Sequence, residues 1–241
     1  FPDGSVFDLT MIHSVTFDLD GTLLDTIADL ADACDEMLRD LGRPPLGVER
    51  VRRFVGKGMA VLVERCLTAA DGRAPDPAWL ASGISSFRHH YAIINGRSAR
   101  LYPGVREGLD AFRALGLPLA VVTNKPTAFT GPLLERTGLA DFFVVSVSGD
   151  TTANKKPHPE PILHACTILG VSPQANLHIG DSDNDLLAAR AAGCLAWAVP
   201  YGYTEAGVVD MANCDALVCS LLEAALRVAE INPKIQAPSP S

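Results

Sequence analysis

Apolar residues gather in short runs along the chain, without the strict alternation that marks a half-exposed strand. Five of these runs are rich in Val, Ile, Leu and Phe, at residues 14–19, 117–123, 142–147, 175–180 and 194–199. Continuous apolar runs of this length are typical of strands that are covered on both faces. The pattern therefore predicts a buried sheet.

Helical patterns separate these runs, at residues 105–115, 127–137, 161–169 and 183–192, and most of them are closed by a glycine. Glycine just after a helical pattern is a common helix end. Strand and helix that alternate in this way form parallel sheets. We therefore expect an α/β fold with a Rossmann-like parallel sheet core.

The stretch from about residue 26 to residue 100 breaks this rhythm. It contains several helix-like segments, at 27–41, 48–55, 59–70 and 77–94, and no convincing strand. Because it follows the first strand directly, it would lie over the carboxyl edge of the sheet, where a lid would be placed. We expect a core of residues 1–25 and 101–241 with a helical cap of residues 26–100.

Composition narrows the possible partners. The chain has 241 residues, 48% of them hydrophobic, and a formal net charge of −8. This content supports a sizeable core and excludes disorder of the whole chain. An acidic chain without a basic patch repels nucleic acid and anionic membranes, so we expect neither as a partner. An anionic substrate would need local positive charge from lysines, helix N-termini or a metal ion.

The six cysteines are scattered without a CxxC pair, and no apolar run is long enough to span a bilayer. A reducing, cytoplasmic location follows as the expectation. Residues 1–10 precede a Met that could begin a natural chain, so they are left out of the fold argument, and residues 233–241 are expected to form a frayed tail. The sequence leaves open whether the protein is a monomer or a homodimer.

Two carboxylates close the first predicted strand, in the sequence Asp18-Leu19-Asp20-Gly21-Thr22. The period of two in a strand puts Asp18 and Asp20 on the same side. Two such charges at one strand end repel each other by a few kcal/mol, at about 4 Å and an effective dielectric near 20. A cation is therefore expected beside them, although Asp and Gly also occur in ordinary turns.

Polar side chains follow the next two strands. Thr123 and Asn124 end the second run, and both can donate hydrogen bonds to a phosphoryl oxygen, although they are also common helix-cap residues. Lys156 precedes a proline, which favours an extended backbone from which the lysine can reach inward. A solvated basic turn is the alternative for this lysine.

The fourth strand leads into Gly180-Asp181-Ser182-Asp183-Asn184-Asp185. Such a density of oxygen-bearing side chains suits a hard cation. Ser182 and Asp185 have the spacing of a capping box, so Asp185 could serve only to begin a helix, whereas Asp181 is the better candidate for a metal ligand. His178, within the apolar run, is expected to be a core residue.

Four motifs in this order, FDLDGTLLD, VVTNK, NKKPHP and GDSDND, resemble those of the haloacid dehalogenase superfamily of phosphohydrolases. The resemblance extends from Val15 to about Leu222. It implies a Mg²⁺-dependent phosphomonoester hydrolase that acts on a small phosphorylated metabolite through an aspartyl phosphate. The helical insert resembles the type-one cap of that superfamily.

The resemblance also implies roles for residues at matching positions. Asp18 would be the nucleophile and Asp20 the general acid and base, while Mg²⁺ would be held by Asp18, Asp181 and the main-chain carbonyl of Asp20. Thr123, Asn124 and Lys156 would bind the phosphoryl oxygens, and Asp185 would steady the lysine or the metal.

The cap carries the weakest signals. Residues 55–58 and the following helix are similar to the cap of phosphoglycolate phosphatases, which makes 2-phosphoglycolate the expected substrate. Gly56 and Lys57 could contact a substrate carboxylate or form a plain turn, and Arg65 could bind substrate or face solvent. A sugar phosphomutase, or a phosphatase for a sugar phosphate or pyrophosphate, remains an alternative. A binding protein or a dehalogenase is disfavoured, because all the chemical residues are present and Asp20 would be an unneeded acid.

Overall fold

The computed structural model describes residues 11–203 and 210–232. The two terminal segments for which the sequence suggested a leader and a frayed tail lie outside the described residues. Within the described part, strands and helices alternate after residue 100, as the hydrophobic pattern predicts.

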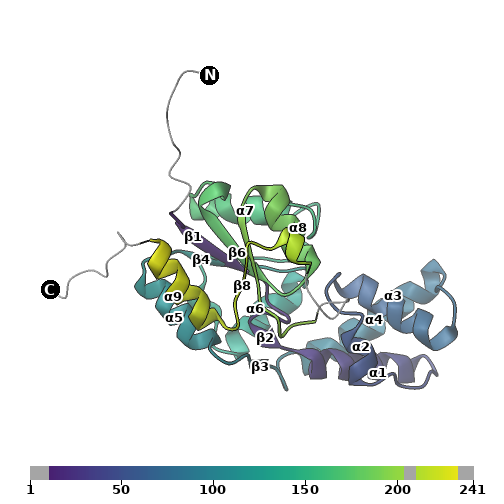
Figure 1. Cartoon of the computed structure of the whole chain (residues 1–241). Coiled ribbons are helices and arrows are strands. Elements are labelled where there is room, and N and C mark those ends of the chain that lie inside the picture. Colours follow the sequence, from purple (N-terminus) through teal and green to yellow (C-terminus); the bar gives the residue numbers. More distant parts are fainter. Residues whose placement is uncertain (1–10, 204–209, 233–241) are drawn as a thin grey trace, which may run out of the picture.

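A parallel sheet forms the centre of the molecule, with the strand order β5-β4-β1-β6-β7-β8 (Figure 1). Every pairing between neighbours in this sheet is parallel. β1 therefore lies in the middle, between β4 and β6, and the three strands end at the same edge. The strands are β1 (Ser14–Phe17), β4 (Leu119–Val122), β5 (Val145–Val147), β6 (Asn176–Gly180), β7 (Leu195–Ala198) and β8 (Ala216–Leu217).

Helices cover both faces of this sheet (Figure 1). Along β4, Leu119 and Val121 belong to one apolar cluster, and Ala120 and Val122 belong to the other. This alternation explains why the strand is apolar throughout, because both of its faces are buried. The first face packs on α5 (Val105–Ala114), α6 (Thr127–Arg136) and α9 (Leu221–Ile231), and the second on α7 (Glu160–Leu169) and α8 (Asp183–Ala192).

Four helices, which we call the helical unit, lie beside the sheet and share one apolar cluster, to which Phe129 and Tyr203 of the core also belong (Figure 1). They are α1 (Ile27–Asp40), α2 (Val48–Arg52), α3 (Met59–Asp71) and α4 (Pro77–Ile94). The unit is entered and left through an antiparallel ribbon of β2 (Leu24–Asp25) and β3 (Arg100–Leu101). The short 3₁₀ helices are η1 (Ala140–Phe142), η2 (Pro173–Ala175) and η3 (Met211–Asn213).

The predicted α/β class is confirmed, whereas three details differ from the expectation. The ribbon of β2 and β3, which was not expected, flanks the region of residues 26–100 at its two ends. β8 and α9 extend the core beyond the last predicted strand. β2, β3 and β8 have two residues each, which is too short for a hydrophobic period to be recognised.

In the part of the chain that the structure describes, no helix is both long and apolar enough to cross a bilayer.

Candidate active site

Lys156 forms the centre of the polar cluster at the carboxyl edge of the sheet. Its Nζ lies 2.6 Å from Asp18 Oδ1 and 2.6 Å from Asp185 Oδ1, and it also donates to the carbonyl of Val122. Asp18 and Val122 come from the ends of β1 and β4, Asp185 from the first turn of the helix after β6, and Lys156 from the loop before α7. The lysine is thus buried and inward-facing, and it is not part of a solvated turn.

Charge and burial work against each other in this cluster. Burial raises the pKa of Asp18 to about 7, and the nearby charge of Lys156 opposes this rise. Burial alone would also raise the pKa of Asp185, but Lys156 and His178 outweigh it and hold this pKa below its usual range. Asp185 is therefore the firmly ionised partner of the lysine. His178 is fully buried, as expected of a core residue.

The carboxylate of Asp20 faces a second lysine. Lys125 Nζ lies 3.0 and 3.1 Å from the two oxygens of Asp20, and the hydroxyl of Thr26 donates to Asp20 Oδ1 over 2.6 Å. Lys125 also donates to the hydroxyl of Tyr91, which comes from α4 in the helical unit. Asp20 is thus fixed by contacts from the core and from the base of α1.

Thr123 and Asn124 both reach this edge, with different surroundings. The hydroxyl oxygen of Thr123 accepts from the main chain of Lys125, which leaves its hydrogen available as a donor. The side chain of Asn124 is engaged with the main chain of Lys156 in both directions, and it also donates to the carbonyl of Gly56. Its amide therefore supports the lysine loop and joins it to the helical unit.

Oxygen atoms of Asp18, Asp181 and Asp185 lie within 4.8 Å of one another, a grouping that can hold a metal ion. The hydroxyl of Thr22 and the main-chain nitrogen of Tyr203 donate to the two oxygens of Asp181. Burial, together with the charges of Asp18 and Asp185, raises the pKa of Asp181 well above its usual value. A cation would relieve this repulsion.

Two glycines leave room around Asp181. A Cβ atom at Gly202 would lie 2.1 Å from Asp181 Oδ2, and one at Gly21 would lie 2.3 Å from the same atom. No side chain fits at those distances, so the backbone itself packs around the carboxylate. Three carboxylates with a lysine bound to only two of them form a hard, oxygen-rich donor set, which fits a divalent cation such as Mg²⁺.

Two cavities meet at Asp18, Asp20 and Gly56. The acidic cavity is also lined by Lys156, Asp181, Ser182, Asn184, Asp185 and Tyr203. The apolar cavity opens toward the helical unit, and its walls include Leu30, Val55, Met59, Leu62, Phe87 and Phe129, together with Tyr91, Thr123 and Lys125. A molecule that reacts with Asp18 can therefore place an anionic head in the first cavity and its remainder in the second.

Residues 12–193 match the family of haloacid dehalogenase-like hydrolases. The chain belongs to this family. A curated phosphoglycolate phosphatase from Thiobacillus denitrificans is 49% identical over 90% of this chain and 96% of its own length. The Escherichia coli K12 phosphoglycolate phosphatase is 39% identical over 87% of this chain and 90% of its own.

Two solved structures share the arrangement. A predicted phosphoglycolate phosphatase from Haemophilus somnus superposes with a TM-score of 0.85 at 32% identity, over 90% of this chain and 98% of its own. CbbY from Rhodobacter sphaeroides, in complex with phosphate, has a TM-score of 0.76 at 26% identity, over 90% of this chain and all of its own.

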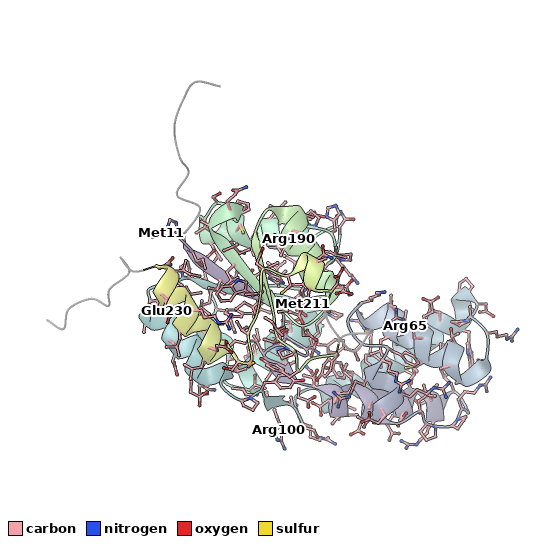
Figure 2. All side chains as sticks on the ribbon, viewed as in Figure 1. Met11, Arg65, Arg100, Arg190, Met211 and Glu230 are labelled. Atoms are coloured by element: carbon pink, nitrogen blue, oxygen red, sulfur yellow. The ribbon has the colours of Figure 1, made fainter. Side chains whose placement is uncertain are left out.

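The three residues of this hydrolase that were singled out in the helical unit lie in different places. Gly56 lines both cavities, and its carbonyl accepts from Asn124 and Asn184. Lys57 is exposed and is not among the described residues that line either cavity. Arg65, on α3 (Figure 2), donates to the carbonyl of Phe54 and likewise lines neither cavity.

Three residues near Asp18, Asp20 and Asp181 were not expected from the sequence. Lys125 directly follows Thr123 and Asn124 within the motif VVTNK, so its position was a signal that could have been used. Tyr91 falls in the periodic pattern of α4, where an aromatic residue indicates packing. Tyr203 follows β7 at the edge of the described segment and has no local motif. Contacts across 105 and 178 residues bring Lys125 to Asp20 and Tyr203 to Asp25.

Proposed function

We propose that the chain is a Mg²⁺-dependent phosphatase of 2-phosphoglycolate, in which Asp18 attacks phosphorus. The observation that carries this proposal is the contact of Lys156 Nζ with Asp18 Oδ1 at 2.6 Å, next to Asp181 and Asp185. The second oxygen of Asp18 has no hydrogen-bond donor among the described residues, and it is free to react. The relatives named phosphoglycolate phosphatases support the substrate.

In the first half of the reaction, an oxygen of Asp18 forms a bond to phosphorus while the ester bond between phosphorus and the leaving oxygen breaks. Asp20 gives its proton to that leaving oxygen. Lys125 and Thr26 hold the carboxyl group of Asp20 in position for this transfer. In the second half, water cleaves the aspartyl phosphate and Asp20 accepts a proton from that water.

Lys156 and the Thr123 hydroxyl would bind the transferring phosphoryl oxygens. Asn124 would act by fixing the main chain of Lys156, which it contacts twice. Asp18, Asp181 and the main-chain carbonyl of Asp20 would hold Mg²⁺, and Asp185 would keep Lys156 in place. The bound cation supplies positive charge that lessens the repulsion between the Asp18 carboxylate and an anionic phosphate.

Residues 26–100 would act as the cap that covers the reacting groups. Their contacts with the core support this role, because Gly56 accepts from Asn124 and Asn184, and Tyr91 accepts from Lys125. A closed cap excludes bulk water and selects the leaving group. Gly56, which lines both cavities, is the cap residue we assign to substrate contact.

The test is phosphate release from 2-phosphoglycolate, with Mg²⁺ and with a chelator, by the native chain and by Asp18→Asn. We expect the native chain to release phosphate when Mg²⁺ is present and not when the chelator is present. The rate of release should be at least about 10³-fold lower in Asp18→Asn. Asp32→Asn, an exposed carboxylate on α1, is the matched control and should retain activity. Equal release by Asp18→Asn and the native chain would end the proposed mechanism.

A sugar phosphomutase is the second candidate, since another CbbY structure of similar likeness is a complex with xylulose-1,5-bisphosphate. The apolar walls of the cavity beside Asp20 disfavour a sugar, because they offer few partners for its hydroxyl groups. Supplying a sugar phosphate with a catalytic amount of its bisphosphate distinguishes the two, because a mutase yields an isomer and a phosphatase yields free phosphate.

A further inference from the structure

A tyrosine hydroxyl and a lysine ammonium meet where the helical unit faces Asp20. Tyr91 is 1% exposed and Lys125 is 6% exposed, and Tyr91 Oη lies 2.6 Å from Lys125 Nζ. The reaction described above uses Lys125 to hold Asp20 and gives Tyr91 no role. A buried phenol whose hydroxyl faces a cavity requires a partner, because burial removes its bonds to water.

The Tyr91 hydroxyl has a donor in Lys125, but an acceptor for its own hydrogen is missing among the described residues. An ammonium group can only donate, so Tyr91 Oη is the acceptor in its contact with Lys125. The hydrogen of the Tyr91 hydroxyl has no acceptor among residues 11–203 and 210–232. Tyr91 and Lys125 both line the apolar cavity, next to Asp20. An occupant of the cavity therefore meets an unused donor beside a positive charge.

Neither group changes its protonation near neutral pH. Burial raises the pKa of Tyr91, so the phenol keeps its hydrogen. Burial would lower the pKa of Lys125, but Asp20 and Tyr91 outweigh this and raise it, so the ammonium keeps its charge. While Asp20 carries the proton that it gives to the leaving oxygen, the charge of Lys125 is not cancelled by Asp20, and a donor beside this cation suits an anion, since hydrogen bonds to charged groups are stronger than neutral ones.

The other walls of this cavity restrict what the anion can be attached to. Leu30, Met59, Leu62 and Phe129 offer no hydrogen-bonding groups, so a leaving group rich in hydroxyls would be poorly satisfied. Lys125 touches Asp20, which protonates the leaving oxygen in the proposed reaction. The anion must therefore lie only a few bonds from that oxygen.

We propose that Tyr91 and Lys125 bind the carboxylate of the leaving group, so that this site selects phosphomonoesters of short hydroxy acids. The inference rests on the proposed phosphatase function and deepens it. Tyr91 donates its free hydrogen to the carboxylate, and Lys125 supplies the compensating charge. The pair thereby distinguishes 2-phosphoglycolate from an ester of equal length without a carboxylate.

Tyr91→Phe is a suitable probe because it removes only the hydroxyl. The ring stacks on Phe87 at 5.2 Å between centroids and meets Phe129 edge-on at 5.0 Å, and phenylalanine retains both contacts. Tyr201→Phe is the matched control. It also removes one tyrosine hydroxyl, which donates to the carbonyl of Thr22, and Tyr201 does not line the described part of either cavity.

Binding is measured by calorimetry with two phosphonates that cannot be hydrolysed, 3-phosphonopropanoate and propylphosphonate, which lacks the carboxylate. We expect the native chain to prefer 3-phosphonopropanoate and Tyr91→Phe to reduce that preference about tenfold or more. In kinetics, the ratio of kcat/KM for 2-phosphoglycolate to that for ethyl phosphate should fall by a similar factor in Tyr91→Phe. We expect this fall to come from a higher KM for 2-phosphoglycolate. Tyr201→Phe should leave both ratios unaltered.

An equal loss for both ligands in Tyr91→Phe would overturn the inference, because it would mean that the hydroxyl only positions Asp20. No loss for either ligand would overturn it as well. If the native chain released no phosphate from 2-phosphoglycolate, the proposed function would fail, while the preference between the two phosphonates would still decide the inference.

Discussion

The main-chain nitrogen of Tyr203 donates to Asp181 Oδ2 over 2.6 Å, although 22 residues separate the two. The hydroxyl of the same tyrosine accepts from the main chain of Thr26 and Ile27 and donates to Asp25. One residue therefore contacts a carboxylate of the acidic cavity and the first turn of α1. The main chain of Tyr203 thus holds Asp181, and its side chain holds the base of the helical unit.

Replacing Tyr203 by phenylalanine should disturb the base of the helical unit and keep the main-chain bond to Asp181. The main-chain groups of Thr26 and Ile27 lose their acceptor, so we expect the free energy of unfolding to fall by about 1–3 kcal/mol. Because the Thr26 hydroxyl holds Asp20, kcat should also fall. Urea denaturation and steady-state kinetics measure the two effects. An unchanged free energy of unfolding would contradict this assignment.

Replacing Lys156 by methionine should destabilise the fold as well as abolish activity. The variant leaves Asp18 and Asp185 buried without their shared cation, a change that typically costs about 3–5 kcal/mol. Denaturant unfolding checks this value. Lys155→Met is the matched control, because this lysine is exposed and its loss should stay within about 0.5 kcal/mol. Similar stabilities of the two variants would refute the central place of Lys156.

Asp181→Asn should change stability in opposite directions with and without Mg²⁺. Without metal, the variant removes one of three crowded carboxylates, and asparagine can still accept from Tyr203, so Tm should rise by about 2–4 °C for each kcal/mol of repulsion removed. With Mg²⁺, the native chain should gain stability that grows with the metal concentration, and the variant should gain much less.

Thermal unfolding over a series of Mg²⁺ concentrations measures this difference without any substrate. Na⁺ at matched ionic strength serves as the control for screening. An identical response of Asp181→Asn and the native chain to Mg²⁺ would remove Asp181 from the proposed metal ligands.

Much of the fold follows from the sequence because its strands are buried on both faces. Residues 117–123 and 175–180 differ from the observed β4 and β6 by two residues or fewer at each end. The shared edge of a parallel sheet also explains why Asp18, Lys156 and Asp181 could be expected together. Their convergence is a consequence of chain order and strand direction, both of which are encoded locally.

The contacts around Asp20 could not be inferred in this way. The Tyr91 hydroxyl reaches Lys125 only because α4 packs against the loop after β4, and helical periodicity says nothing about which core residue an aromatic side chain will meet. The amide of Asn124 was expected to face phosphate, but which of its neighbours it would bond depended on the path of the loop that carries Lys156. Local sequence predicts chemistry at strand ends, whereas long-range packing decides the partners.

The ribbon of β2 and β3 joins the helical unit to the core through only two residue pairs, Leu24 with Leu101 and Asp25 with Arg100. The ribbon is not part of the central sheet, so insertions or exchanges in the segment between β2 and β3 should leave the pairing of the central strands unchanged. An exchange of the whole helical unit at this ribbon would also replace Tyr91, the partner of the lysine that holds Asp20, so we expect a change of substrate preference made in this way to alter the proposed acid as well.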